Sequence, residues 1–206
     1  LQHNKENIIP EGNTTYVNEP TLFAKPDAKL TTLLIVPASL VYNWENEIKR
    51  FTPEMKLCIY KGNQRKKSIE HLQNFDIVLS SYHTIRQDID LISSFIFHYI
   101  ILDESQVIKN PGSMLYKTVT KLKSQFKLVL TGTPVENSLT DLWTQLNFVN
   151  PGLLGDLSYF RREFAKPIEK QGDDEKEIKL RKIIRPFILR RTKEMVARDL
   201  PPVSEQ

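Results

Sequence analysis

Long apolar runs and cysteine pairs are both missing from this chain of 206 residues. Its single cysteine, Cys58, cannot form an internal disulfide, which fits a reducing compartment. No apolar run approaches the length that crosses a bilayer, and no signal peptide opens the sequence. We therefore expect no membrane partner. The composition, rich in Ile, Lys and Asn, favours a bacterial cytoplasmic protein, and a eukaryotic source would make it nuclear.

Glycine is scarce as well, with seven residues in the chain. No two of them have the spacing of the phosphate-binding loop G-x-x-x-x-G-K-[ST], and none precedes Lys-Ser or Lys-Thr. That loop supplies the backbone amides and the lysine that hold nucleotide phosphates. We therefore expect that this chain by itself neither hydrolyses ATP nor binds it tightly.

Charge of either sign is modest overall, with a formal net charge of +4, but basic residues gather near one end. Between positions 176 and 193 only Glu177 is acidic, and eight residues are basic: Lys176, Lys179, Arg181, Lys182, Arg185, Arg190, Arg191 and Lys193. Such a patch attracts phosphates, but it is equally typical of a solvated helix face.

What the sequence does contain is an alternation of short apolar runs and amphipathic segments. Residues 1–32 come first and lack an apolar period, which indicates an irregular insertion or linker. The expected strands are 33–36, 57–60, 76–80, 99–102 and 126–130, and the expected helices are 40–51, 64–73, 85–96 and 113–122. This alternation predicts an α/β fold, with a parallel sheet covered by helices on both faces.

After Pro134 the pattern predicts helices alone, one over residues 138–150 and a second from residue 156. Side chains that accept amide hydrogen bonds mark the helix starts. Ser39 is expected to cap the first helix of the chain, and Asp156 the second helix of this later region. Ser138 and Asp141 have the spacing of a capping box.

Two carboxylates, Asp103 and Glu104, directly follow the apolar run at residues 99–102. The carboxyl ends of parallel strands are where open α/β sheets bind ligands. An acidic pair there suits a nucleotide-hydrolysing site, with one carboxylate holding Mg²⁺ through its water shell and the other orienting water. The same pair also occurs at ordinary strand ends. Small polar residues after the other strands, at 37–39, 80–82 and 131–133, favour a single shared site.

Six segments together resemble a known family. In order and spacing they are similar to Swi/Snf-type ATPases of helicase superfamily two, which translocate on double-stranded DNA without unwinding it. The segments are residues 35–44, 77–82, 102–110, 130–137, 185–193 and 200–201. The resemblance implies a RecA-like, three-layer P-loop-type fold with about five strands present, the P-loop strand missing, and a C-terminal helical protrusion.

The resemblance implies a role for each residue of the acidic segment. Asp103 would hold Mg²⁺ through water, Glu104 would activate the attacking water, and Gln106 stands where the family has histidine. A glutamine can still hydrogen-bond to the loop of Thr131, Gly132 and Thr133, which in the family couples nucleotide state to the grip on DNA.

The resemblance also assigns contacts with partners. The first lobe of these ATPases contacts the DNA backbone at the positions of Ser39, Ser81, Tyr82, Lys109 and Asn110. Hydroxyl and amide groups suit phosphate oxygens, which fix register without reading sequence. Arg190 and Arg191 resemble residues that brace the first lobe against the second.

The implied organisation is an incomplete first lobe. Residues 33–137 would form part of ATPase lobe 1, residues 138–202 the helical region and the return to lobe 1, and residues 203–206 the start of a linker. ATP and Mg²⁺ would act in the longer protein, with duplex DNA and the second lobe as partners. A sheet lacking one strand has an unpaired edge, so self-association of the chain is expected.

Two other functions stay open. One is another superfamily-two helicase or restriction-type motor, which acts on RNA or unwinds DNA. The other is a degenerate, non-catalytic module that binds DNA or protein.

Overall fold

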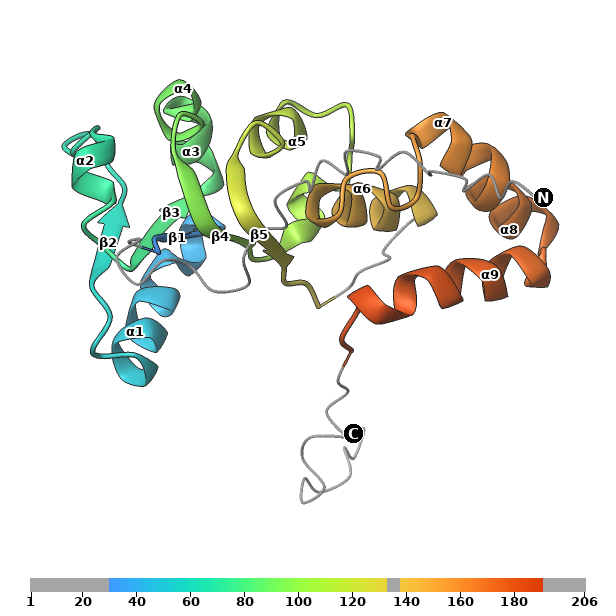
Figure 1. Cartoon of the computed structure of the whole chain (residues 1–206), viewed down its shortest axis with the longest axis horizontal. Coiled ribbons are helices and arrows are strands. Elements are labelled where there is room, and N and C mark those ends of the chain that lie inside the picture. Colours follow the sequence, from blue (N-terminus) through green and yellow to red (C-terminus); the bar gives the residue numbers. More distant parts are fainter. Residues whose placement is uncertain (1–29, 133–137, 191–206) are drawn as a thin grey trace, which may run out of the picture.

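A sheet of five parallel strands forms the centre of the computed structural model, which describes residues 30–132 and 138–190 (Figure 1). The strands are β1 (Thr32–Val36), β2 (Leu57–Tyr60), β3 (Ile77–Ser81), β4 (Ile96–Leu102) and β5 (Lys123–Val129). Their order is β2-β3-β1-β4-β5, so β1 lies between β3 and β4. The predicted parallel α/β sheet is confirmed. Because the strands run the same way, the loops after β1, β3, β4 and β5 all leave the sheet at the carboxyl ends of its strands, which together form the sheet edge.

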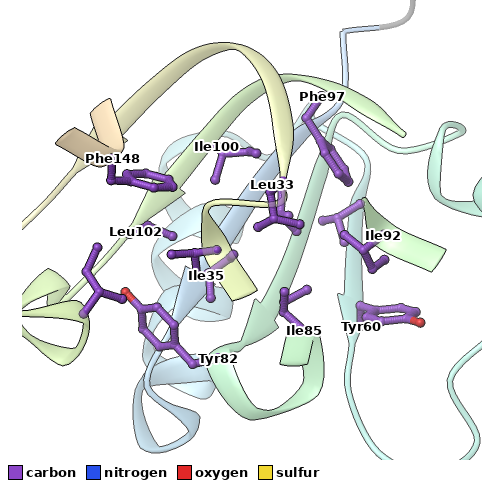
Figure 2. Close-up of a cluster of buried hydrophobic side chains, with 14 of the residues drawn as sticks. Leu33, Ile35, Tyr60, Tyr82, Ile85, Ile92, Phe97, Ile100, Leu102 and Phe148 are labelled. Atoms are coloured by element: carbon purple, nitrogen blue, oxygen red, sulfur yellow. The ribbon is translucent and has the colours of Figure 1, made fainter. Parts of the chain in front are cut away.

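Helices cover the two faces of the sheet unequally. On one face, the 3-10 turn η1 (Ala38–Leu40) leads into α1 (Val41–Phe51), which packs on β1 and β3. The opposite face carries the larger core, built with α2 (Ile69–Leu72), α3 (Tyr82–Gln87), α4 (Ile89–Ile92) and α5 (Met114–Val119). Figure 2 shows this core, where side chains of the sheet lie among side chains of the helices: Leu33, Ile35, Ile100, Ile85, Ile92 and Phe148.

The last described segments form a helical region with a core of its own. Its elements are α6 (Leu139–Val149), α7 (Leu157–Phe160), the π-helical turn Arg161–Ala165, α8 (Lys166–Gln171), α9 (Asp174–Ile184) and the 3-10 turn η4 (Arg185–Phe187). Helix α6 joins the two cores, since Phe148 packs in the sheet core while Leu142 and Trp143 pack with the other helices. Because α6 is buried on all sides, it contacts both the sheet and the other helices, and it therefore fixes the helical region to the sheet.

Strand β5 is an end strand of the sheet in the described part of the chain. Its side chains Phe126 and Leu128 are 51% and 44% exposed, and the Phe126 ring stacks on Tyr99 of β4 with centroids 5.0 Å apart. The self-association expected from an unpaired edge stays a prediction. No helix among the described residues is long and apolar enough to span a bilayer.

Two predicted helix caps are wrong. Ser39 does not cap α1, because the chain already turns at Pro37, whose carbonyl accepts the Leu40 amide at 2.9 Å within η1. The Ser39 side chain is exposed instead. Ser138 does not cap α6 with its hydroxyl, which donates to the Asp141 carboxylate at 3.3 Å. The expected cap at Asp156 is confirmed, since its carboxylate accepts the amide of Tyr159 at 2.8 Å.

Two predicted helices have the wrong bounds. In place of a helix over 64–73, only Ile69–Leu72 is helical, because Ser68 is extended and caps the helix there, its hydroxyl accepting the His71 amide at 3.3 Å. In place of one helix over 85–96 there are two short helices, α3, which already begins at Tyr82 and ends before Asp88, and α4, which ends at Ile92. Residues from 96 onward belong to β4, because Phe97 is fully buried in the sheet core.

Candidate active site

The acidic pair lies directly after β4, near the middle of the sheet edge. The backbone amide of Asp103 donates to the carbonyl of Ile35 in β1 at 2.9 Å, which continues the sheet pairing by one residue. Glu104 then adopts φ 49° and ψ 51°, the left-handed region, and is the one non-glycine residue with positive φ in the described part of the chain. Such strain costs of order 1–3 kcal/mol and gathers at functional sites. The reversal starts the 3-10 turn η2 (Ser105–Ile108).

Asp103 is held by two side chains from other elements. The indole Nε1 of Trp44 in α1 donates to Asp103 Oδ2 at 2.6 Å. The hydroxyl of Tyr82 in α3 donates to the backbone carbonyl of Asp103 at 2.8 Å. Burial raises the pKa of Tyr82, and the negative charges of Asp103 and Glu104 raise it further, so this phenol stays a donor.

Glu104 is joined to the loop after β5 through Gln106. The amide Nε2 of Gln106 donates to Glu104 Oε2 at 2.6 Å, and the hydroxyl of Thr131 donates to Gln106 Oε1 at 3.1 Å. The hydrogen bond predicted between Gln106 and the threonine loop is therefore present. Gly132 follows at the exposed surface, whereas Thr133 lies outside the described residues.

The turn η2 is anchored to helix α6 of the helical region. The buried Ser105 hydroxyl donates to Gln145 Oε1 at 2.9 Å, and the Thr144 hydroxyl donates to the carbonyl of Lys109 at 3.0 Å. Sequence reasoning assigned no role to Thr144, Gln145 or the indole N–H of Trp44. These residues lie next to apolar residues at helical spacing. That spacing is the one sequence signal that their polar groups are buried and need hydrogen-bond partners.

The residues predicted to contact DNA lie at the same sheet edge but differ in exposure. Ser39 and Asn110 are exposed, and Asn110 Oδ1 accepts the Gly112 amide at 2.8 Å. Ser81 is 6% exposed, and its hydroxyl accepts the Thr84 amide at 3.2 Å as the cap of α3. Tyr82 is buried and bonded to the Asp103 carbonyl, and Lys109 is half-buried.

The basic segment is in part a solvated helix face. In α9, Lys176 pairs with Glu163 at 3.1 Å and Arg181 with Glu177 at 2.5 Å. Arg185 and Arg190 are exposed, and they border a groove of about 630 Å³ whose floor is apolar. Arg191 and Lys193 lie outside the described residues.

Mg²⁺ fits the donor set at Asp103 and Glu104. In proteins it is usually held by one or two carboxylates together with substrate phosphates and waters, and dedicated all-protein cages are unusual. The described chain has no group of three or more His, Cys, Asp or Glu side chains that could hold a metal alone. The site therefore suits a cation that arrives with phosphates, and Asp103 and Glu104 are the residues that would hold it.

Comparisons with known proteins agree with this geometry. A model of the SNF2-related domain matches residues 5–206. An uncharacterized ATP-dependent helicase of Mycoplasma genitalium is 45% identical over 174 residues, 84% of this chain and 16% of that protein. The TATA-binding protein-associated factor MOT1 of Saccharomyces cerevisiae is 38% identical over 186 residues, 84% of this chain and 10% of that protein.

A solved structure gives the same result for the fold. The SWI2/SNF2 ATPase core of Sulfolobus solfataricus in complex with dsDNA has a TM-score of 0.76 and 41% identity, over 85% of this chain and 37% of that one. The RecA-like fold class that the sequence motifs implied is confirmed. The chain spans less than a fifth of the length of the two curated relatives.

Proposed function

This chain belongs to the SNF2-related domain family, and from that premise we propose that it is part of a longer ATPase that moves along double-stranded DNA. The observation that carries the proposal is the set of hydrogen bonds at the acidic pair. Asp103 is fixed by Trp44 and Tyr82, and Glu104 is joined through Gln106 to Thr131. One carboxylate pair is thus connected to helix α1, helix α3 and the loop after β5.

The acidic pair divides the chemistry of hydrolysis between its members. Mg²⁺, when bound with ATP, would supply positive charge against the phosphates. Asp103 would hold that ion through its water shell. Glu104 would orient the attacking water and accept its proton, and the bond from Gln106 at 2.6 Å limits where its carboxylate can point.

The Thr131 loop would couple the nucleotide state of the acidic site to the binding of DNA. Gln106 donates to Glu104 and accepts from Thr131, so a displacement of one reaches the other through a single amide group. Ser39, Ser81, Tyr82, Lys109 and Asn110 are the proposed backbone contacts. Gly132 and Thr133 complete the coupling loop, and Arg190 and Arg191 are proposed to brace a second lobe.

The proposal extends to location, in a bacterial cytoplasm or a eukaryotic nucleus, with the single cysteine as support. The test of function uses the full-length protein. Its ATPase activity is expected to rise with duplex DNA and to rise little with RNA or single-stranded DNA. Stimulation by RNA, or unwinding of a duplex, would instead favour a helicase or restriction-type motor. ATP binding without turnover on any nucleic acid would favour the degenerate module.

The chain of 206 residues alone is expected to show no ATP hydrolysis above background, because its sequence contains no phosphate-binding loop. A phosphate-release assay with and without duplex DNA measures this directly. DNA-stimulated hydrolysis that disappears in a Glu104→Gln variant of the same chain would show that the expectation is wrong.

Replacing Gln106 by leucine in the full-length protein is expected to lower duplex-stimulated turnover about tenfold. The change removes two hydrogen bonds worth about 1 kcal/mol each and leaves Glu104 free to rotate. Gln106→His is expected to keep turnover within a few-fold, because an imidazole can donate at one nitrogen and accept at the other. Gln125→Leu is the matched control, since the exposed Gln125 side chain on β5 hydrogen-bonds to His98 at 2.8 Å, away from the acidic pair. Equal turnover of the leucine and histidine variants would contradict the role given to Gln106.

A further inference from the structure

Asp103 accepts hydrogen bonds from side chains of two helices, α1 and α3. Trp44 reaches its carboxylate from α1, 59 residues earlier in the chain, and Tyr82 reaches its carbonyl from α3. The two bonds therefore fix different parts of the residue. Trp44 limits the rotation of the carboxylate, and Tyr82 limits the position of the backbone that carries it.

The indole N–H is the single polar group of the Trp44 side chain, and it donates to Asp103. Its ring packs on the apolar cluster between α1 and the sheet, where it also lines a cavity of about 410 Å³ with Leu34, Ile48 and Ile101. Packing alone would accept any large apolar side chain at this position. The indole N–H adds one directed bond, 2.6 Å long, to the carboxylate of Asp103.

Trp44 and Tyr82 are the two tethers of Asp103, and each lies in a helical segment that begins near a serine proposed to touch DNA. Ser39 lies in η1, which continues without interruption into α1, so its position and that of Trp44 belong to one helical piece. Ser81 caps α3, and Tyr82 is the first residue of that helix. A displacement of Ser39 or Ser81 by DNA would therefore also displace Trp44 or Tyr82, the side chains that are bonded to Asp103.

We propose that Trp44 and Tyr82 are positioning residues that transmit DNA contact at the sheet edge to the Mg²⁺-holding carboxylate of Asp103. This inference rests on the proposed function. It gives the Trp44 N–H and the Tyr82 O–H a task in addition to core packing and the proposed DNA contact at Tyr82: they set the orientation of Asp103 according to the position of η1 and α3.

The first test needs no ligand and uses this chain. It contains two tryptophans, Trp44 and Trp143, so a Trp143→Phe chain reports the emission of Trp44 alone. Adding Asp103→Asn removes the charged acceptor and is expected to change that emission. The same Asp103→Asn change in a Trp44→Phe chain should leave the emission of Trp143 unchanged, because its indole donates to the Gly155 carbonyl at 3.1 Å. An unchanged Trp44 emission would overturn the bond on which the proposal stands.

The second test measures the full-length protein. Trp44→Phe and Tyr82→Phe keep the rings and remove only the N–H and the O–H. Each is expected to lower the ratio of duplex-stimulated to basal ATPase rate about tenfold. The matched controls are Trp143→Phe and Tyr116→Phe, whose polar groups contact Gly155 and Asn147 away from the acidic pair, and they should keep the wild-type ratio.

The outcomes separate the two proposals. A wild-type protein without duplex stimulation would overturn the proposed function and this inference with it. Normal stimulation in the wild type and in both tether variants would overturn the inference alone. Thermal melts of every variant, read by circular dichroism, identify a variant that fails to fold. Because two independent tethers are tested, the loss of one such variant leaves the other to decide.

Discussion

Replacing Glu104 by glutamine in the full-length protein is expected to lower ATP turnover by about 10²–10⁴-fold while ATP binding is retained. The amide has the size of the carboxylate but cannot accept a proton from the attacking water. Its oxygen can still accept the bond from Gln106, so the chain of contacts to Thr131 is kept. Steady-state phosphate release measures turnover, and titration with a fluorescent ATP analogue measures binding.

The backbone at position 104 makes this substitution a clean one. Glu104 holds a left-handed conformation, and glutamine meets the same steric cost there, so the strain is equal in the two proteins. Glu54→Gln serves as the control, because Glu54 is an exposed carboxylate in the turn before β2. Turnover at the wild-type level in the Glu104 variant would remove Glu104 from the role of general base.

The sheet could be predicted from the sequence because its strands carry their own signal. The apolar residues at 33–36, 57–60 and 77–79 show no alternation with polar residues, which is typical of strands buried on both sides. Parallel strands place their carboxyl ends together, so the residues after each strand could be assigned to a shared site before their positions were known. The fold class and the location of the acidic pair follow from local pattern plus one topological rule.

The contacts within the site could not be predicted in the same way. The Trp44 indole looks like one more apolar residue at helical spacing, and its partner lies 59 residues away. The family pattern places Tyr82 at the DNA backbone and gives no sign that its hydroxyl donates to the carbonyl of Asp103. Which donor meets which acceptor depends on the order of strands in space, and the sequence pattern leaves that order open. The bond between Gln106 and Thr131 was predictable only because the family pattern pairs those two loops.

The bounds of α2 and α3 were misplaced for a related reason. Local propensity favours a helix through Arg65 and another through Asp88, because each residue alone looks like a solvated helix side chain. In the structure Arg65 lies before the start of α2 and Asp88 is the C-cap of α3, and their side chains meet. The Asp88 carboxylate is 4% exposed and accepts from Arg65 at 2.5 Å, Lys67 at 2.8 Å and Tyr60 at 2.7 Å. The partners of this cluster are far apart in the sequence, so the local pattern gives no sign that Arg65 and Asp88 lie outside the helices.

Removing the charge of Asp88 is accordingly expected to be costly. Asp88→Asn should lower the free energy of unfolding by about 3–5 kcal/mol, because it leaves Arg65, itself 6% exposed, without its carboxylate. Chemical denaturation followed by circular dichroism gives the free energy. Asp90→Asn is the matched control, since Asp90 is exposed in the first turn of α4 and should change stability by less than about 0.5 kcal/mol. Equal losses in the two variants would contradict a structural role for the buried cluster.

The pH dependence of folding supplies a second measure of the same cluster. Burial alone would raise the pKa of Asp88, but the hydrogen bonds from Arg65, Lys67 and Tyr60 outweigh it and hold the pKa well below the usual range. The folded state therefore binds fewer protons than the unfolded state, whose aspartate pKa is about 3.9. The stabilisation is complete above that value and is lost as pH falls below it toward the lowered pKa of the folded state. Between about pH 5 and pH 3 the wild-type chain should lose more stability than Asp88→Asn, which has no carboxylate to protonate at this position, and parallel curves for the two would show that Asp88 is not the titrating group.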